Sequence, residues 1–237
     1  MMRTLSIAQR EFASFFRQPI GWVVIALFMA LGGVVFSTSI QPGAPATMRG
    51  FFRTAVWLLA FVAPAISMRL FSEELRSGTI EPLMTSPVSD WEIVFGKYLG
   101  GLGFLLAMLA PTLVFPITLE LIAAPDYGPI VAGYAGLILL GALYLAVGVL
   151  FSATTSNQIV AFLATLFFLL FLGIGVSRGA AYLGPPADAA LYALSPELRM
   201  SDFAKGVIDT SHVVFFLAAA LWFLTLCVVT LEVRRWK

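Results

Sequence analysis

One apolar stretch, Ile130 to Phe151, decides the class of fold: IVAGYAGLILLGALYLAVGVLF. It contains no Asp, Glu, Lys, Arg or His, and it is as long as the roughly 20 residues that a helix needs to cross a bilayer core of about 30 Å. Backbone polar groups in lipid must be satisfied within the segment itself. The stretch therefore predicts a transmembrane α-helix.

Working outward, other segments of the chain have the same character. Four further stretches lack ionisable residues: Ile20 to Ile40, Tyr98 to Leu119, Ile159 to Val176, and Val213 to Leu231. A sixth, Phe51 to Met68, is interrupted only by Arg53 near its start, where a long side chain can snorkel to the interface. The expected fold class is an all-α, polytopic bundle of six transmembrane helices, forming a single domain over residues 1–237.

The composition agrees with a membrane protein. Hydrophobic residues make up 60% of the chain and charged residues only 11%, with a mean hydropathy of +0.95. A soluble domain is about one quarter charged, because polar residues must cover its surface. The net charge is +1, from 14 basic and 13 acidic residues, so no overall electrostatic attraction favours a nucleic-acid partner.

Basic residues in the connections predict the direction of the spans, because the cytoplasmic side of a membrane protein carries an excess of Lys and Arg. With the N-terminus inside, the cytoplasmic side holds Arg3, Arg10, Arg17, Arg69, Arg76, Lys97, Arg234, Arg235 and Lys237. The other side keeps Arg49, Arg53, Arg178, Arg199 and Lys205. This bias predicts that both termini are cytoplasmic.

The first 18 residues predict an amphipathic helix before the first span. Arg3, Arg10 and Arg17 repeat at seven residues, opposite a face of Leu5, Ala8, Phe12, Phe15 and Phe16. One interpretation is an interfacial elbow helix, with the arginines at the membrane interface against anionic lipid. The other is an amphipathic helix that packs on a neighbouring element.

The largest cytoplasmic connection is FSEELRSGTIEPLMTSPVSDWEIVFGK, from Phe71 to Lys97. In this segment we expect Ser72 to cap a short helix and Gly78 to end it in a left-handed conformation. Thr79 then caps a second helix with Glu81 in its first turn. A third helix begins at Ser89, where Glu92 completes a capping box.

The same segment resembles the signature of ABC-2-type permeases, the membrane subunits of ATP-binding-cassette transporters. The matching residues are Glu73, Glu74, Arg76, Gly78, Thr79, Glu81, Leu83, Pro87, Gly96 and Lys97. Three further segments are similar to the gliding-motility-associated subclass of these permeases. They are REFASFFRQPIGWVVIALF, SNQIVAFL and FAKGVIDTSHVVFFL. The resemblance covers nearly the whole chain.

The resemblance implies a multi-pass protein of the bacterial cytoplasmic membrane. It implies that a cytoplasmic ATPase dimer, which binds ATP and Mg²⁺, receives a short coupling helix from each of two permease chains, in a homodimer or heterodimer. Residues 71–97 would form this coupling loop, with the signature residues and Met84 as the ATPase-binding side chains and Leu83 as a buried anchor. ATP hydrolysis would then drive export or movement of a substrate.

The sequence itself contains no G-x-x-x-x-G-K-[ST] phosphate loop, so we expect no ATPase activity, no cofactor and no catalytic residue in this chain. One His and one Cys cannot supply a metal site. An ion-coupled carrier or channel of six spans is disfavoured because five spans lack ionisable residues. An ATP-driven mechanical process in the envelope stays open as an alternative to transport.

Four smaller features complete the expectations. Gly133, Gly136, Gly141 and Gly148 allow close helix packing in the fourth span, either in a permease dimer or within one chain. Residues 177–212 form a long outer connection, in which Ser195 and Pro196 begin a short helix. Cys227 is expected to be a packing residue, and His212 is assigned no role.

Overall fold

A computed structural model of the chain describes residues 2–40, 46–79, 88–176, 182 and 194–235. Within these residues all the regular elements are helical. Six helical segments are long and apolar enough to cross a membrane, which confirms the predicted all-α six-span bundle.

The helices follow one another with short connections. The first is α1 (Met2–Arg17). The six candidate spans are α2 (Pro19–Ser39), α3 (Arg49–Ser67) continued by α4 (Arg69–Ser77), α6 (Asp90–Leu109) continued by η1 (Ala110–Leu113) and α7 (Val114–Ile122), α8 (Tyr127–Thr154), α9 (Gln158–Leu170) continued by η2 (Phe171–Gly175), and α13 (Thr210–Arg235). A shorter helix, α12 (Pro196–Phe203), precedes the last span.

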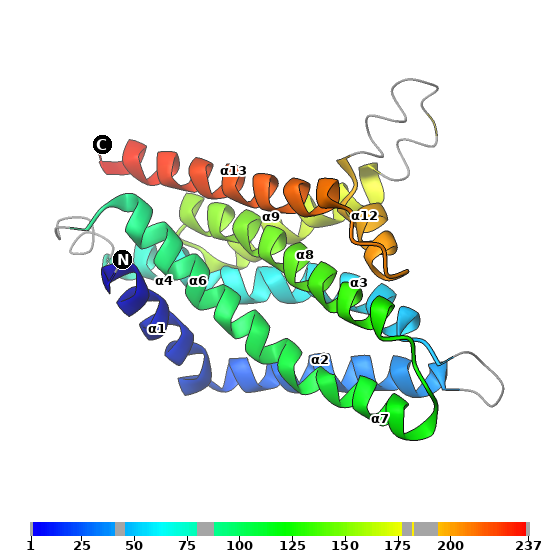
Figure 1. The fold of residues 1–237 in the computed structure, drawn as a ribbon. Coiled ribbons are helices and arrows are strands. Elements are labelled where there is room, and N and C mark those ends of the chain that lie inside the picture. The colour runs from blue at the N-terminus through cyan, green and yellow to red at the C-terminus, as the bar shows by residue number, and fades with distance from the viewer. Residues whose placement is uncertain (1, 41–45, 80–87, 177–181, 183–193, 236–237) are drawn as a thin grey trace.

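The elements gather at two ends of the bundle. Figure 1 shows α1, α4 and the C-terminal end of α13 at one end, which we call the α4 end. It shows α7 and α12 at the opposite end, which we call the α12 end. The segments that the sequence analysis assigned to the cytoplasm therefore lie together.

Helix α8 forms the centre of the bundle. It packs against α3, α4, α6, α9, α12 and α13, and about 72% of its most apolar stretch is buried. Its glycines face other helices of the same chain: a Cβ atom on Gly136 would lie 2.8 Å from Phe203 Cβ, and one on Gly148 would lie 2.7 Å from Ser67 Cβ. Of the two interpretations of these glycines, the structure supports packing within one chain.

The break between α3 and α4 is held by a buried hydroxyl group from α8. Ser152 Oγ accepts hydrogen bonds from the backbone amides of Phe71, at 3.0 Å, and Ser72, at 3.1 Å. The same oxygen donates to the Met68 carbonyl at 2.9 Å. Backbone groups at this break thus have a partner away from water, as buried polar groups require.

The expected cap at Ser72 is wrong, because α4 already begins at Arg69. Ser72 is fully buried inside the helix, and its hydroxyl group donates to the Met68 carbonyl. Burial against α8, rather than capping, explains the serine at this position.

Two other local predictions are confirmed. Gly78 ends α4 with φ of +72°, the left-handed conformation that favours glycine. At the start of α6, the Ser89 side chain accepts from the Glu92 amide, and the Glu92 carboxylate accepts from the Ser89 amide. This capping box fixes the direction in which α6 leaves the loop.

The short helix in the connection before the last span begins at Pro196, directly after Ser195, as predicted.

His212, at the start of α13, has a structural role that the sequence did not indicate. Its Nδ1 accepts from Arg199 at 2.8 Å, and its Nε2 lies 3.3 Å from Asp202 Oδ2. Hydrogen bonds from Lys205 and His212 lower the pKa of Asp202. The cluster ties α12 to α13.

Candidate functional site at the junction of α1, α4 and α6

Small residues on α6 allow α1 to lie directly against it. A Cβ atom on Gly96 would come within 2.8 Å of Ile7 Cβ, and one on Gly100 within 2.6 Å of Glu11 Cβ. The spacing of four residues places both glycines on one face of α6, where they form the surface that receives α1. Gly96, singled out in the sequence as a signature residue, thus has a packing reason to be small.

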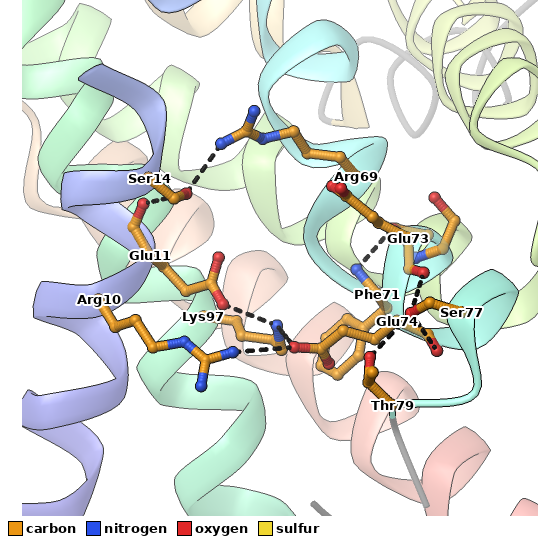
Figure 2. Close-up of polar contacts among 12 residues, drawn as sticks. Arg10, Glu11, Ser14, Arg69, Phe71, Glu73, Glu74, Ser77, Thr79 and Lys97 are labelled. Carbon is orange, nitrogen blue, oxygen red and sulfur yellow. Dashed lines mark hydrogen bonds and ion pairs between the residues drawn. The ribbon is translucent and has the colours of Figure 1, made fainter. Parts of the chain in front are cut away.

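A lysine on α6 lies at the centre of this junction. Lys97 Nζ donates to Glu11 Oε1 of α1 at 2.9 Å and to Glu74 Oε1 of α4 at 2.8 Å. Its side chain is 2% exposed, and the two carboxylates are 14% and 15% exposed. Figure 2 shows Lys97 between the two acidic side chains, so three separate helices meet on one ammonium group.

A second basic residue lies at the edge of the same group. Arg10 Nη2 is 3.8 Å from Glu74 Oε1, but its side chain is 74% exposed. An exposed, long ion pair contributes little energy because water screens it. Lys97 is therefore the cation that holds the two carboxylates together.

Arg69 forms another link between α4 and the end of α1. Its guanidinium group donates to Ser14 Oγ at 2.8 Å and to the side-chain oxygen of Gln18. It also lies 4.3 Å from the centre of the Phe15 ring, within the range of a cation–π contact. Ser14 donates in turn to the Glu11 carbonyl at 2.7 Å. Figure 2 shows how Arg69 reaches across to α1.

We call this set the charged junction: Arg10, Glu11, Ser14, Gln18, Arg69, Glu74 and Lys97. A cavity of about 300 Å³ opens between these residues and the end of α4, where Ser77 and Thr79 also line it. Glu74 Oε2 is buried and has no hydrogen-bond partner among the described residues. The cavity thus lies between the charged junction and the exposed end of α4.

The signature residues fall into two sets. Glu74, Gly96 and Lys97 belong to the junction and its packing surface, whereas Glu73, Arg76, Gly78 and Thr79 are exposed at the end of α4. Glu81, Leu83, Met84 and Pro87 lie outside the described residues. Of the basic residues assigned to the membrane interface, Arg3, Arg10 and Arg17 are all exposed on α1.

The apolar side chains of α1 fall into a buried group and an exposed group. Ala8 and Phe15 are buried against the rest of the chain, whereas Leu5 and Phe12 are 57% and 37% exposed. The helix therefore packs on a neighbour and also presents apolar and basic side chains outward. The two interpretations of its sequence are compatible in this arrangement.

Sequence reasoning missed Glu11, Ser14, Gln18 and Arg69 as members of the site. Glu11 is the only acidic residue in the first 72 positions, and that isolation was a signal that it has a specific partner. The repeat of small residues at Gly96 and Gly100 was a second signal, since it marks a close helix contact. Neither signal identifies the residue or the helix that forms the contact.

The sequence of the chain matches that of a known protein family. The sequence model of a family described as ABC-2 family transporter protein matches residues 5–234, which is nearly the whole chain. No match was found among curated proteins. The match includes most of α1, the charged junction and all six candidate spans. As a member of this family, the chain is a multi-span membrane component without ATPase activity or a cofactor of its own. The chain therefore belongs to the ABC-2 family of transporter proteins.

Proposed function

We propose that this chain is the permease through which a separate cytoplasmic ATPase dimer moves the membrane spans, and that the charged junction carries this movement. The observation that supports the proposal is the buried Lys97, which joins α1, α4 and α6 at the base of the coupling loop. The family membership supports an ATP-binding-cassette ATPase as the partner in general. ATP and Mg²⁺ bind to that partner.

Movement of the ATPase is transmitted first to the exposed end of α4. The signature residues Glu81, Leu83 and Pro87 enter the groove of the ATPase together with Met84. Glu73, Arg76, Gly78 and Thr79 lie at the edge of the contact. A displacement of α4 is passed through Glu74 to Lys97 on α6 and through Lys97 to Glu11 on α1. Separating these groups would leave a buried charge unpaired, so the three helices move as one body.

The complex contains a second permease chain, identical or related, and lies in the bacterial cytoplasmic membrane. Arg3, Arg10 and Arg17 anchor α1 at the lipid headgroups. The similarity of three further segments to gliding-motility-associated permeases supports a place in that subclass. The spans carry a substrate outward, and a mechanical task in the envelope is the alternative use of the same movement.

We expect the α4 end to face the cytoplasm, because nine of the fourteen basic residues fall on that side. Single cysteines at Thr79 and Val207, each in a Cys227→Ser background, should react with an impermeant thiol reagent from opposite sides of the membrane. Both positions are exposed. Thr79 follows α4 and Val207 follows α12, and these two helices lie at opposite ends of the bundle (Figure 1). Reaction of both positions from the same side would refute the topology.

The partner contact is tested by the variant Leu83→Asp. A carboxylate in a desolvated groove is costly unless it is paired, so the ATPase should no longer co-purify with the tagged permease. The matched control is Val207→Asp, an apolar-to-charged change at the α12 end, which should retain the ATPase. Undiminished binding by Leu83→Asp would remove the coupling role of this segment.

A second arm tests the transmission of movement in the intact complex. Spin labels at Gln9 on α1 and Ser77 on α4, both exposed, should keep the same separation with and without ATP. Labels at Gln9 and Val207 should change their separation, because the junction moves relative to the α12 end. An ATP-dependent change within the first pair would mean that the junction is not a rigid body.

A further inference from the structure

A large cavity lies near the α12 end of the bundle, far from the charged junction along α3. Its volume is about 640 Å³, and residues of α3, the turn η2 and α12 line it. In Figure 1, α12 lies beside the start of α3 at the end of the bundle opposite α4. A volume of this size is typical of a ligand pocket.

The charged groups of the cavity come from two of its walls. Arg49 and Arg53 lie one turn apart on α3, and neither forms an ion pair within the described part of the chain. Lys205 also lines the cavity, but it is paired with Asp202 at 2.9 Å. One acidic residue, Glu197, opposes them, and its burial raises the pKa of its carboxyl group, an effect that nearby Arg53 reduces. Counted over the described lining residues, the two arginines exceed the single carboxylate of Glu197 and give the cavity an excess of positive charge.

The rest of the lining is apolar. Trp57, Ile174 and Leu198 form part of the wall, and each is at least partly exposed to its interior or its mouth. Phe167 on α9 and Phe171 in η2 are 65% and 64% exposed, as expected of apolar side chains that face lipid. An acyl chain on this face of the span would lie close to Ile174, which lines the cavity from the same turn.

The π-helical turn η2 supplies the open space on one side. Single π turns inside helices occur frequently at functional sites. Gly173 of this turn lines the cavity, and among the described residues a Cβ atom placed on it would meet Glu197 Oε2, at 4.0 Å. This is an ordinary van der Waals distance, so a larger side chain at position 173 would occupy part of the cavity.

We propose that this cavity binds an anionic membrane phospholipid, with the phosphate at Arg49 and Arg53 and an acyl chain against Trp57, Ile174 and Leu198. Guanidinium groups suit phosphate oxygens because they can donate two parallel hydrogen bonds. Free phosphate would use the arginines and leave the apolar wall without a ligand. The charge and the wall together favour a lipid, and the site is independent of ATPase docking.

Trp57 provides the probe for the test. In a variant that retains only this tryptophan, with Trp22, Trp91, Trp222 and Trp236 replaced by Phe, vesicles containing a small fraction of phosphatidylglycerol with brominated acyl chains should quench the fluorescence. Brominated phosphatidylcholine at the same fraction should quench less, with an apparent preference on the order of tenfold from two cations near the phosphate. A single-Trp222 variant is the control, because Trp222 is 58% exposed on α13 and lies outside the cavity lining.

Two sets of variants connect the signal to the cavity. Arg49→Gln with Arg53→Gln should abolish the preference for the anionic lipid, whereas Arg76→Gln at the α4 end should retain it. Gly173→Leu should reduce the quenching of Trp57 by both lipids, because its side chain fills the space. Inorganic phosphate in the buffer should leave the quenching unchanged, and displacement by phosphate would indicate a free-anion site instead.

Equal quenching of Trp57 by the two lipids would mean that it contacts only ordinary surrounding lipid and would overturn the proposal. A second measurement uses the chain with all its tryptophans. Mass spectrometry of the detergent-purified protein should find an anionic phospholipid retained by the unmodified chain and lost from the Arg49→Gln and Arg53→Gln double variant. Equal retention by both proteins would also overturn the proposal.

Discussion

Replacement of Lys97 by methionine is expected to destabilise the protein strongly, by about 3–5 kcal/mol, because removal of one partner leaves buried charges uncompensated. Methionine preserves most of the volume of the lysine side chain, so the effect reports on charge rather than on packing. Glu11 and Glu74 would then face each other at the junction without the ammonium group between them. The apparent melting temperature of the detergent-solubilised chain, followed by fluorescence-detected size exclusion, measures the loss.

The matched control is Lys205→Met. Lys205 also forms an ion pair at 2.9 Å, with Asp202, but its side chain is 56% exposed. An exposed pair contributes at most about 1 kcal/mol, so this variant should melt close to the unmodified chain. Addition of Glu11→Gln and Glu74→Gln to Lys97→Met should restore much of the stability, since no buried charge then remains in the triad. Equal melting of the Lys97 and Lys205 variants would contradict the importance of the buried network.

The second large effect is expected from Gly148→Ala in the central helix. On an open helix surface this change stabilises, because alanine has a higher helix propensity than glycine. At position 148 the new Cβ atom would lie 2.7 Å from the Cβ atom of the buried Ser67 on α3. Two Cβ atoms cannot approach so closely, so the backbones of α8 and α3 must separate, with a cost of about 1–3 kcal/mol or more.

Gly33→Ala serves as the control for this variant, because its Cβ atom would meet Phe115 at an ordinary 3.8 Å. The melting temperature of each variant, measured in the same detergent, gives the comparison. The exchange Ser67→Gly with Gly148→Ala moves the side-chain atom to the other helix and should recover most of the loss. A Gly148→Ala chain as stable as the Gly33→Ala chain would show that α3 and α8 can separate without cost.

The sequence predicted the features that depend on neighbours along the chain. The absence of charge over Ile130 to Phe151 was sufficient for a span, and the φ angle of Gly78 follows from the left-handed helix end that glycine favours. The capping box at Ser89 and Glu92 is likewise a contact over three residues. Such features need no knowledge of the tertiary fold.

The features that the sequence could not predict depend on contacts between distant segments. Lys97 and Glu11 are 86 residues apart, and no local pattern pairs them. Ser72 has the residue type of a helix cap, yet its environment is decided by the buried face of α8. The glycines of the fourth span left two packing partners open for the same reason, since a small residue indicates a close approach without indicating the approaching helix.

The pairing of Glu11 with Lys97 has a consequence for the order of biosynthesis. The ribosome makes α1 before α6, but the lysine and the two glycines that hold α1 belong to α6, which follows after two hydrophobic spans. Until α6 has been translated, Glu11 has no Lys97 to bind, and α1 lacks its packing surface. Helix α1 therefore reaches its final packed position only after α6 has been made.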